Sequence, residues 1–567
     1  MRRLLLILVL LFAAPQVSAQ PSGPRFISIA FHDVVDRPED LAYEAITTPS
    51  LVQFFDWLKG TGWTAISLDD VRAAADGGRP LPDKAILLTF DDGLKSLYTR
   101  VFPLLRAYRY PAVASLVGSW MEDTPDGLVL YGDKKVPRST FVSWAEAREM
   151  QESGLVELAS HSFDLHQGIQ ANPQGGRTPS AMTWRYDPAA RAYADDAGYR
   201  VRIREDLERS RQTMAAQLGR APRTLVWPYG RYTGPGLEIA KQAGFTFALT
   251  LEPEPAYASD LFEIPRSYPT DNPSLADLVR DLTFAPDRPK THRIACLSLD
   301  ALAAVPDGVA QNEALGRMIE DVRALGADTV VLDANVALSS PGAPLGAVYF
   351  PTDLRPLAKD LLGRATWQIR TRAGVDVFLH LPVGAAAAAV GEDQVTALFG
   401  HMMRYSLADG LVIDMPPLAD GPPVAARRDA VRARRDALDP AQLPAQARLA
   451  MAAFRAAAAT DPRLRLMLAM SRPGAPPDWA DIGLQPPVAD VREVAALAER
   501  FKAGGWLEPE AAGRIAFALP PGTANQIEAL RQAQRRGASD FALCPAALPA
   551  PSRLPAAFSA ATYPYKP

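Results

Sequence analysis

Long basic runs and long apolar runs are both scarce in this sequence of 567 residues. Its 60 Lys and Arg are balanced by 64 Asp and Glu, which gives a formal net charge of −4 at pH 7. Because the basic residues form no long run, the sequence argues against nucleic acid as the main partner. Beyond the N-terminus no stretch is long and apolar enough to span a bilayer, so we expect no transmembrane segment in the mature chain.

The N-terminus has the three parts of a signal peptide. Residues 1–3 are a basic start, residues 4–14 form a short apolar core, and residues 17–19 fit the small-residue pattern before Gln20. This pattern predicts that residues 1–19 are removed on export. The residue at the cleavage point is not the cysteine that a lipoprotein requires.

Histidine is also scarce, with six in the whole chain. Three of the six, His32, His161 and His166, follow short apolar runs in the first third of the sequence. Such runs are typical of buried parallel strands, and functional side chains gather at the carboxyl ends of these strands. This placement favours one shared site over three unrelated surface histidines.

Two adjacent carboxylates, Asp91 and Asp92, end the apolar run 85–90 and precede a glycine. Adjacent carboxylates at a strand end are costly unless positive charge lies between them. A divalent cation held by Asp92, His161 and His166 would supply that charge and leave Asp91 free as a base. Taken alone, Asp-Asp-Gly is more often a turn or a helix cap.

Two further strand ends complete the candidate site. His32 follows the apolar run 26–31 and fits a general acid, because a histidine titrates near neutrality. The run 224–227 ends in a Pro-Tyr-Gly turn, in which the backbone N–H of Tyr229 can face a developing oxyanion. Without the other motifs, a surface histidine and a plain turn are the simpler interpretations.

These motifs resemble the polysaccharide deacetylases of carbohydrate esterase family 4. Their order is similar to the circularly permuted branch that N-deacetylates poly-β-1,6-N-acetylglucosamine in bacterial biofilms, and the match spans about residues 25–275. The resemblance implies that Asp91 is the catalytic base, that Asp92 and the histidines of the His-Ser-Phe-Asp-Leu-His motif are the metal ligands, and that His32 is the histidine which ordinary members carry late in the chain. Two histidines and one carboxylate suit zinc, cobalt, nickel or ferrous iron.

The expected reaction is hydrolysis of N-acetyl groups on this polymer in the periplasm, where the product would meet outer-membrane export machinery. Two alternatives stay open. One is a deacetylase of another glycan, such as peptidoglycan or chitin oligomers. The other is a glycan-binding export module whose catalysis has decayed.

Strand-like and helix-like segments alternate through residues 25–275, which predicts an α/β barrel or a related wound sheet. A polar insertion follows His166, and loops of this length are often functional lids. We expect it to cap the sugar groove, and we take Trp184 in the insertion and Trp227 as candidate substrate-binding residues. The segments expected to be helical are 51–59, 101–109, 145–151, 202–218 and 237–242.

A second domain is expected after a linker at 276–292. With 48% hydrophobic residues the chain can bury two large cores. Residues 293–567 contain eight strand-like runs separated mostly by helical ones, which predicts a (β/α)8-like barrel. These runs are 293–299, 329–333, 347–350, 375–381, 410–414, 464–470, 514–519 and 540–544.

This half resembles the glycoside-hydrolase-like, glycan-binding domain of the same family, with one departure. Where the family has an acidic pair, this chain has Met415 and Pro416, and Asp414 replaces the preceding histidine. Hydrolysis of a glycosidic bond normally needs two carboxyl groups, so we expect binding without efficient cleavage. Asp333 and Asp414 either bind glucosamine ammonium groups or are ordinary strand-end residues.

The chain has two cysteines, Cys296 and Cys544. If the second half closes into a barrel, they lie on its first and last strands, which are neighbours. A disulfide is possible in an oxidising compartment, but the sequence does not give the distance between the two residues, and two separately buried thiols are the simpler interpretation.

Overall fold

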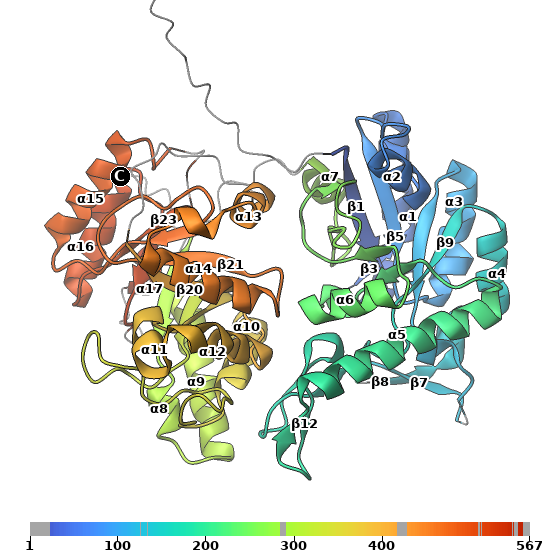
Figure 1. Cartoon of the computed structure of the whole chain (residues 1–567). Helices are drawn as coiled ribbons and strands as arrows, with labels where there is room; N and C mark the ends of the chain where they lie inside the picture. Colours follow the sequence, from blue (N-terminus) through green and yellow to red (C-terminus); the bar gives the residue numbers. More distant parts are fainter. Residues whose placement is uncertain are drawn as a thin grey trace, which may run out of the picture.

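The computed structural model describes residues 23–42, 44–124, 126–132, 134–283, 291–416, 428–508, 511, 513–546, 548 and 554–558. The expected signal peptide lies outside these residues. Two α/β domains stand side by side, the first drawn from blue to green and the second from yellow to red (Figure 1). Among the described residues, no helix combines the length and the apolar character needed to cross a membrane.

The first domain is built on one sheet of order β15-β14-β9-β6-β5-β1-β16, in which β4 also pairs with β5. All neighbours are parallel except β16, which is antiparallel to β1. The central strand β5 is buried along its whole length, which explains its unbroken apolar sequence. The strands are β1 (Arg25–Phe31), β4 (Thr64–Ala65), β5 (Ala85–Phe90), β6 (Ala112–Leu116), β9 (Val156–Ser160), β14 (Thr224–Val226), β15 (Phe247–Leu249) and β16 (Ala256–Tyr257).

A short segment, residues 264–267, connects the two sides of this sheet. Ile264 forms a parallel bridge to Leu249 of β15, and Ser267 forms one to Ile29 of β1. The backbone N–H of Ala30 donates to the carbonyl of Ser267 at 2.8 Å. This closing segment therefore joins the β1 and β15 sides of the sheet, and it carries Arg266 to the carboxyl end of β5.

The five predicted helices of this domain are present, and most begin earlier than predicted because a polar residue caps them. Thr47 caps α1 through Ser50 N–H, Ser143 forms a capping box with Glu146 at α4, and Asp195 caps α5. The helices are α1 (Thr48–Gly60), α2 (Leu68–Ala75), α3 (Phe102–Tyr108), α4 (Trp144–Glu152), α5 (Asp196–Leu218), α6 (Gly234–Gln242) and α7 (Leu275–Thr283). Helix α7 occupies the first part of the expected linker, where Leu278 and Leu282 are buried.

The polar insertion after His166 is ordered into two small hairpins rather than a single loop. They are β10 (Gly168–Gln170) with β11 (Arg177–Pro179), and β12 (Tyr186–Asp187) with β13 (Ala192–Tyr193). Tyr193 donates to Asp360 of the second domain at 2.6 Å. The remaining short pairs are β2 (Asp33–Val35) with β3 (Ala45–Thr47), and β7 (Leu128–Tyr131) with β8 (Lys134–Pro137).

The second domain is a closed parallel barrel, as predicted. Two of the predicted strands need correction. Residues 347–350 form only isolated bridges, because this apolar segment packs over the end of β18 instead of entering the sheet, whereas the short run at 482–484 is a true strand. The strands are β17 (Arg293–Leu297), β18 (Thr329–Asp333), β19 (Asp376–His380), β20 (Gly410–Met415), β21 (Arg465–Met470), β22 (Ile482–Leu484), β23 (Ile515–Ala518) and β24 (Asp540–Leu543).

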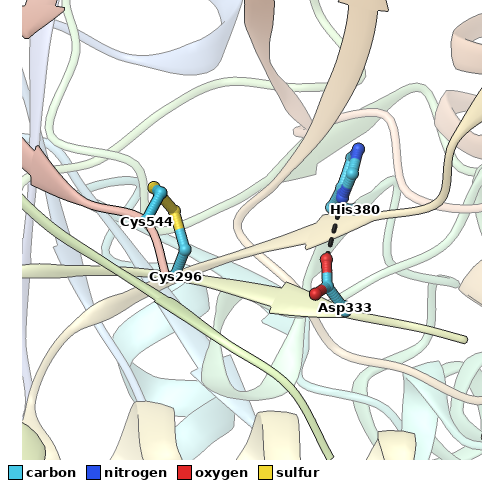
Figure 2. Close-up of a disulfide and its surroundings, with 4 residues drawn as sticks. All are labelled: Cys296, Asp333, His380 and Cys544. Carbon is cyan, nitrogen blue, oxygen red and sulfur yellow. Dashed lines mark hydrogen bonds and ion pairs between the residues drawn. A yellow bond between two sulfur atoms is a disulfide. The ribbon is translucent and has the colours of Figure 1, made fainter. Parts of the chain in front are cut away.

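Helices surround this barrel, and its interior is filled by apolar side chains such as Val331, Phe378 and Met467. Cys296 and Cys544 form a disulfide with a Cα–Cα distance of 4.7 Å, which joins the first strand to the residue after the last one (Figure 2). The helices are α8 (Asp300–Ala303), α9 (Val309–Leu325), α10 (Leu362–Ala373), α11 (Val383–Val390), α12 (Glu392–Arg404), α13 (Arg428–Asp436), α14 (Ala445–Ala458), α15 (Val491–Ala503), α16 (Thr523–Gln534) and α17 (Leu554–Phe558).

Candidate active site

The three expected metal ligands meet at the carboxyl ends of β5 and β9. The Nε2 atoms of His161 and His166 lie 3.4 and 3.3 Å from Oδ1 of Asp92. Ligand atoms about 2.0–2.1 Å from a tetrahedral metal are separated by roughly 3.3–3.4 Å, so this spacing fits a shared ion. The buried Asp92 Oδ1 accepts no hydrogen bond from the described residues, which leaves it available for such an ion.

The surroundings orient these ligands. Nδ1 of His161 lies 2.7 Å from the carbonyl oxygen of Val226. Since a carbonyl only accepts, Nδ1 carries the proton and the Nε2 lone pair faces Asp92. Burial disfavours a charged Asp92, but His166 and His161 hold the pKa of its carboxyl well below the ordinary value. The site is therefore anionic where a cation would bind.

Three residues of the site lie in the left-handed region of backbone space. Asp92 has φ 73°, Ser162 has φ 68° and Tyr229 has φ 58°. This conformation costs a non-glycine residue about 1–3 kcal/mol, and such strain gathers at functional sites. Each of the three residues lies two or three positions after the end of a strand, β5, β9 or β14.

Asp91 is held by a residue that the sequence did not predict, Arg266 of the closing segment. Its guanidinium donates to both carboxylate oxygens of Asp91, at 2.9 and 2.8 Å, and Ser115 donates to Oδ1 at 2.9 Å. Asp91 is 2% exposed and Arg266 is fully buried. Burial disfavours a charged Asp91, but Arg266 and then His161 lower its pKa to about 2. Asp91 is thus an oriented, permanently ionised carboxylate.

His32 lies beside this group, with 7% of its surface exposed. Its ring packs against Tyr268 at a centroid distance of 4.9 Å. Ligand-type atoms of His32, Glu44 and Asp92 lie within 4.8 Å of one another. The hydroxyl of Tyr268 donates to Glu44 at 2.6 Å, and Tyr131 donates to Oδ2 of Asp92 at 3.0 Å. Glu44, Tyr131 and Tyr268 were missed because no motif surrounds them in the sequence.

Tyr229 forms the opposite wall of the site. It is 40% exposed, and its ring packs on His166 at a centroid distance of 4.3 Å. Among the described residues, its backbone N–H has no hydrogen-bond acceptor, whereas the N–H groups of Gly230 and Arg231 donate within the turn. The N–H of Tyr229 is thus available to an oxyanion, and its role there stays a prediction.

The two tryptophans expected to bind substrate are buried in the protein. Trp227 is fully buried, and Trp184 is 4% exposed, where it stacks on Tyr199 and donates to Asp196. An indole binds a sugar through an open ring face, and neither side chain offers one here. Their large apolar surfaces explain this outcome, since both join one core cluster between the insertion and the sheet.

In the second domain, Asp333 and Asp414 are joined by a histidine that the sequence did not single out. Nδ1 of His380 lies 2.8 Å from Asp333 Oδ1, and its Nε2 lies 3.3 Å from both oxygens of Asp414 (Figure 2 shows the first pair). These residues end strands β18 to β20. Burial opposes a charged His380, but the bonds to Asp333 and then Asp414 raise its pKa to about 10. Both carboxylates remain 42% exposed.

Residues 78–248 match the family model described as polysaccharide deacetylase, and residues 300–401 match the one described as hypothetical glycosyl hydrolase family 13. The first domain is a polysaccharide deacetylase domain. It is followed by a glycoside-hydrolase-like barrel, so the resemblance inferred from the motifs is confirmed.

Named relatives agree with this assignment. The chain is 36% identical over 359 residues to the poly-β-1,6-N-acetyl-D-glucosamine N-deacetylase of Escherichia coli (strain K12), which is 63% of this chain and 53% of that protein. The enzyme of the same name from Staphylococcus aureus (strain N315) is 23% identical over 196 residues, 35% of this chain and 57% of that protein. The chain thus spans about half the length of the curated relatives it matches.

Among solved structures, the de-N-acetylase of Aggregatibacter actinomycetemcomitans is 34% identical, with a TM-score of 0.43, covering 46% of this chain and all of that one. The BpsB deacetylase domain of Bordetella bronchiseptica is 38% identical, with a TM-score of 0.40, covering 45% of this chain and 97% of that one.

Proposed function

We propose that this protein removes N-acetyl groups from poly-β-1,6-N-acetylglucosamine by metal-dependent hydrolysis in the periplasm. The observation that carries the proposal is the buried group in which Asp92, His161 and His166 surround one point and Asp91 stands beside it, fixed by Arg266. The polymer is proposed from the names of the relatives, and the periplasm from the signal-peptide pattern.

Asp92, His161 and His166 would hold the metal, whose charge would polarise both the attacking water and the acetamide carbonyl. Asp91 accepts the proton of that water, because Arg266 and Ser115 leave its carboxylate ionised and fixed in one orientation. The N–H of Tyr229 donates to the carbonyl oxygen as it gains charge.

His32 protonates the departing nitrogen, which leaves as the free amine of glucosamine while acetate is the other product. This role is supported by the neighbours of His32, since ligand-type atoms of His32, Glu44 and Asp92 lie within 4.8 Å of one another and Asp92 is also one of the three proposed metal ligands. Base and acid thus act from different strand ends, Asp91 from β5 and His32 from β1, which are paired neighbours in the sheet.

The test is acetate release by the full chain from β-1,6-linked N-acetylglucosamine oligomers, before and after chelation and after return of zinc, cobalt, nickel or ferrous iron. We expect the chelated protein to be inactive and to recover with at least one of these metals. Chitin and peptidoglycan oligomers run beside them separate the alternative substrates. Equal activity with and without chelator would sink the proposal.

For the second domain we propose glycan binding without efficient cleavage. Asp333 and Asp414 keep exposed oxygens that can accept from glucosamine ammonium groups, which the first domain creates. Met415 is 1% exposed, and its thioether has no ionisable proton to donate to a glycosidic oxygen. This domain would then hold the partially deacetylated polymer and pass it to outer-membrane export machinery. A glycan-binding export module without catalysis would bind the polymer in the same way.

A further inference from the structure

One side chain of the second domain reaches the active-site turn of the first. Arg463, just before β21, is 9% exposed, and its Nη1 donates to the carbonyl oxygen of Gly230 at 3.2 Å. Gly230 ends the turn Pro228–Gly230, whose middle residue is Tyr229. The two domains are therefore in direct contact at the wall of the candidate active site.

The guanidinium of Arg463 is held from several sides. Its Nε and Nη2 donate to the two oxygens of Asp461, each at 3.1 Å, and its Nη1 lies 3.6 Å from Oε1 of Glu252. It also lies over the ring of Tyr232, 4.9 Å from the centroid. Burial opposes its charge, but Asp461 and then Glu252 raise its pKa above the ordinary value. The group that contacts Gly230 is thus a fixed cation rather than a mobile surface arginine.

The turn itself needs such support. Tyr229 has φ 58° and ψ 15°, and Gly230 has φ 61°. Glycine adopts this conformation freely, but Tyr229 persists in the left-handed region only where its surroundings hold it. A further contact lies four residues on, where the N–H of Gly234 donates to the carbonyl of Thr460 at 3.1 Å. Residues 460–463 of the second domain thus lie alongside residues 230–234 of the first.

We infer that Arg463 is a positioning residue of the deacetylase site. By holding the carbonyl of Gly230 it keeps the N–H of Tyr229 directed at the reacting carbonyl oxygen and keeps the ring of Tyr229 on His166. This inference rests on the proposed function, because it assigns the Tyr229 N–H to the oxyanion. The second barrel would then support catalysis in the first domain directly, whether or not the barrel also binds glycan.

The test is Arg463→Met in the full chain, assayed on β-1,6-linked N-acetylglucosamine oligomers. A displaced oxyanion donor lowers kcat by about 10- to 100-fold. We expect that loss with KM within twofold of the parent and with unchanged metal content, since substrate contacts and ligands stay in place. Arg404→Met is the matched control, because Arg404 also joins the domains, through Asp196 at 2.9 Å, without touching the turn. It should keep the parent's kcat.

Arg463→Lys guards against a variant that fails to fold. A lysine retains the charge beside Asp461 but cannot hold both Asp461 and Gly230, so we expect a smaller fall in kcat with a melting temperature close to the parent's. A folded Arg463→Lys or Arg463→Met protein with the parent's kcat, or one that has lost its metal, would overturn the inference. An active Asp91→Asn protein would instead overturn the proposed function, so the two failures are distinguishable.

Discussion

In each domain, histidine and carboxylate side chains lie at the carboxyl ends of the parallel strands, but the two domains arrange these side chains differently. In the first domain, two imidazoles and Asp92 surround one point at distances that suit an ion between them. In the second, the imidazole of His380 lies between Asp333 and Asp414 and bonds to both. Under the proposed function the first arrangement would take its positive charge from a metal, whereas the second supplies it from its own histidine.

Burial separates the sites further. Asp91 and Asp92 are each 2% exposed, whereas the side chains of Asp333 and Asp414 are 42% exposed. A buried, paired carboxylate is suited to proton transfer on a water held in place, and an exposed pair is suited to contact with a cationic ligand from solution. If the proposed functions hold, the comparison teaches that similar residues at equivalent strand ends serve catalysis or binding according to what occupies the space between them.

The largest expected effect is on the base. Asp91→Asn should lower acetate release by about 10²–10⁴-fold, because an amide cannot accept the proton of water. Metal content, measured by elemental analysis of the purified protein, should stay at the parent's level since the three ligands are untouched. Full activity in this variant would show that Asp91 is not the base, and the proposed difference between a catalytic first site and a binding second site would then fail.

The next effect is on stability. Arg266→Met leaves Asp91 buried without its partner, and removal of one member of a buried ion pair costs about 3–5 kcal/mol. Urea unfolding of the full chain should show this loss in the transition of the first domain. Arg223→Met is the control, because Arg223 pairs with Glu157 at a more exposed place, with 38% and 21% of the two side chains exposed. A loss no larger than the control's would show that Arg266 does not hold the base.

Binding by the second domain should change by a smaller amount. Binding is measured in the Asp91→Asn variant, which should not deacetylate the oligomers during the experiment. In this background, Asp414→Asn should weaken the binding of partially deacetylated oligomers by about tenfold, the effect of one charged hydrogen bond. Calorimetry measures the change, and Asp353→Asn, a surface carboxylate near His401, is the control. Shortening of the oligomers by the parent protein over hours would contradict binding without cleavage.

The smallest effect is a pH dependence of stability. The folded pKa of His380 is raised from 6.5 to about 10, so its stabilisation is fully present below about pH 6.5 and is lost as the pH rises toward 10. Since its partners are partly exposed, solvent screening limits the change to about 1–2 kcal/mol. His380→Gln should flatten this part of the unfolding profile and His401→Gln should not. Parallel profiles for the parent and His380→Gln would contradict the bridging role.

Much of the first site could be predicted from sequence, because the carboxyl ends of neighbouring parallel strands meet at one edge. Asp91, Asp92, His161, His166 and His32 each follow an apolar run, so their meeting required only the strand assignment. Arg266 could not be predicted in this way, since it lies 175 residues from Asp91 in a segment too short to show any periodicity. Arg463 was missed because its target belongs to the other domain.

In the second domain the count of strands was right, but one strand was wrong. The run at 347–350 is apolar and buried because it covers the barrel, and burial alone does not separate a covering segment from a strand. The true strand β22 has three residues with a glycine at its centre, so its sequence carries almost no strand signal.

The closing segment 264–267 also bears on when the protein can become active during its synthesis. Asp91 emerges early from the ribosome, whereas the arginine that orients it emerges about 175 residues later. Until residues 264–267 have entered the sheet, the carboxylate of Asp91 lacks the two hydrogen bonds from Arg266. A chain that stops short of this segment would contain Asp92, His161 and His166 and still lack the arginine that holds Asp91, so under the proposed function we expect it to be inactive.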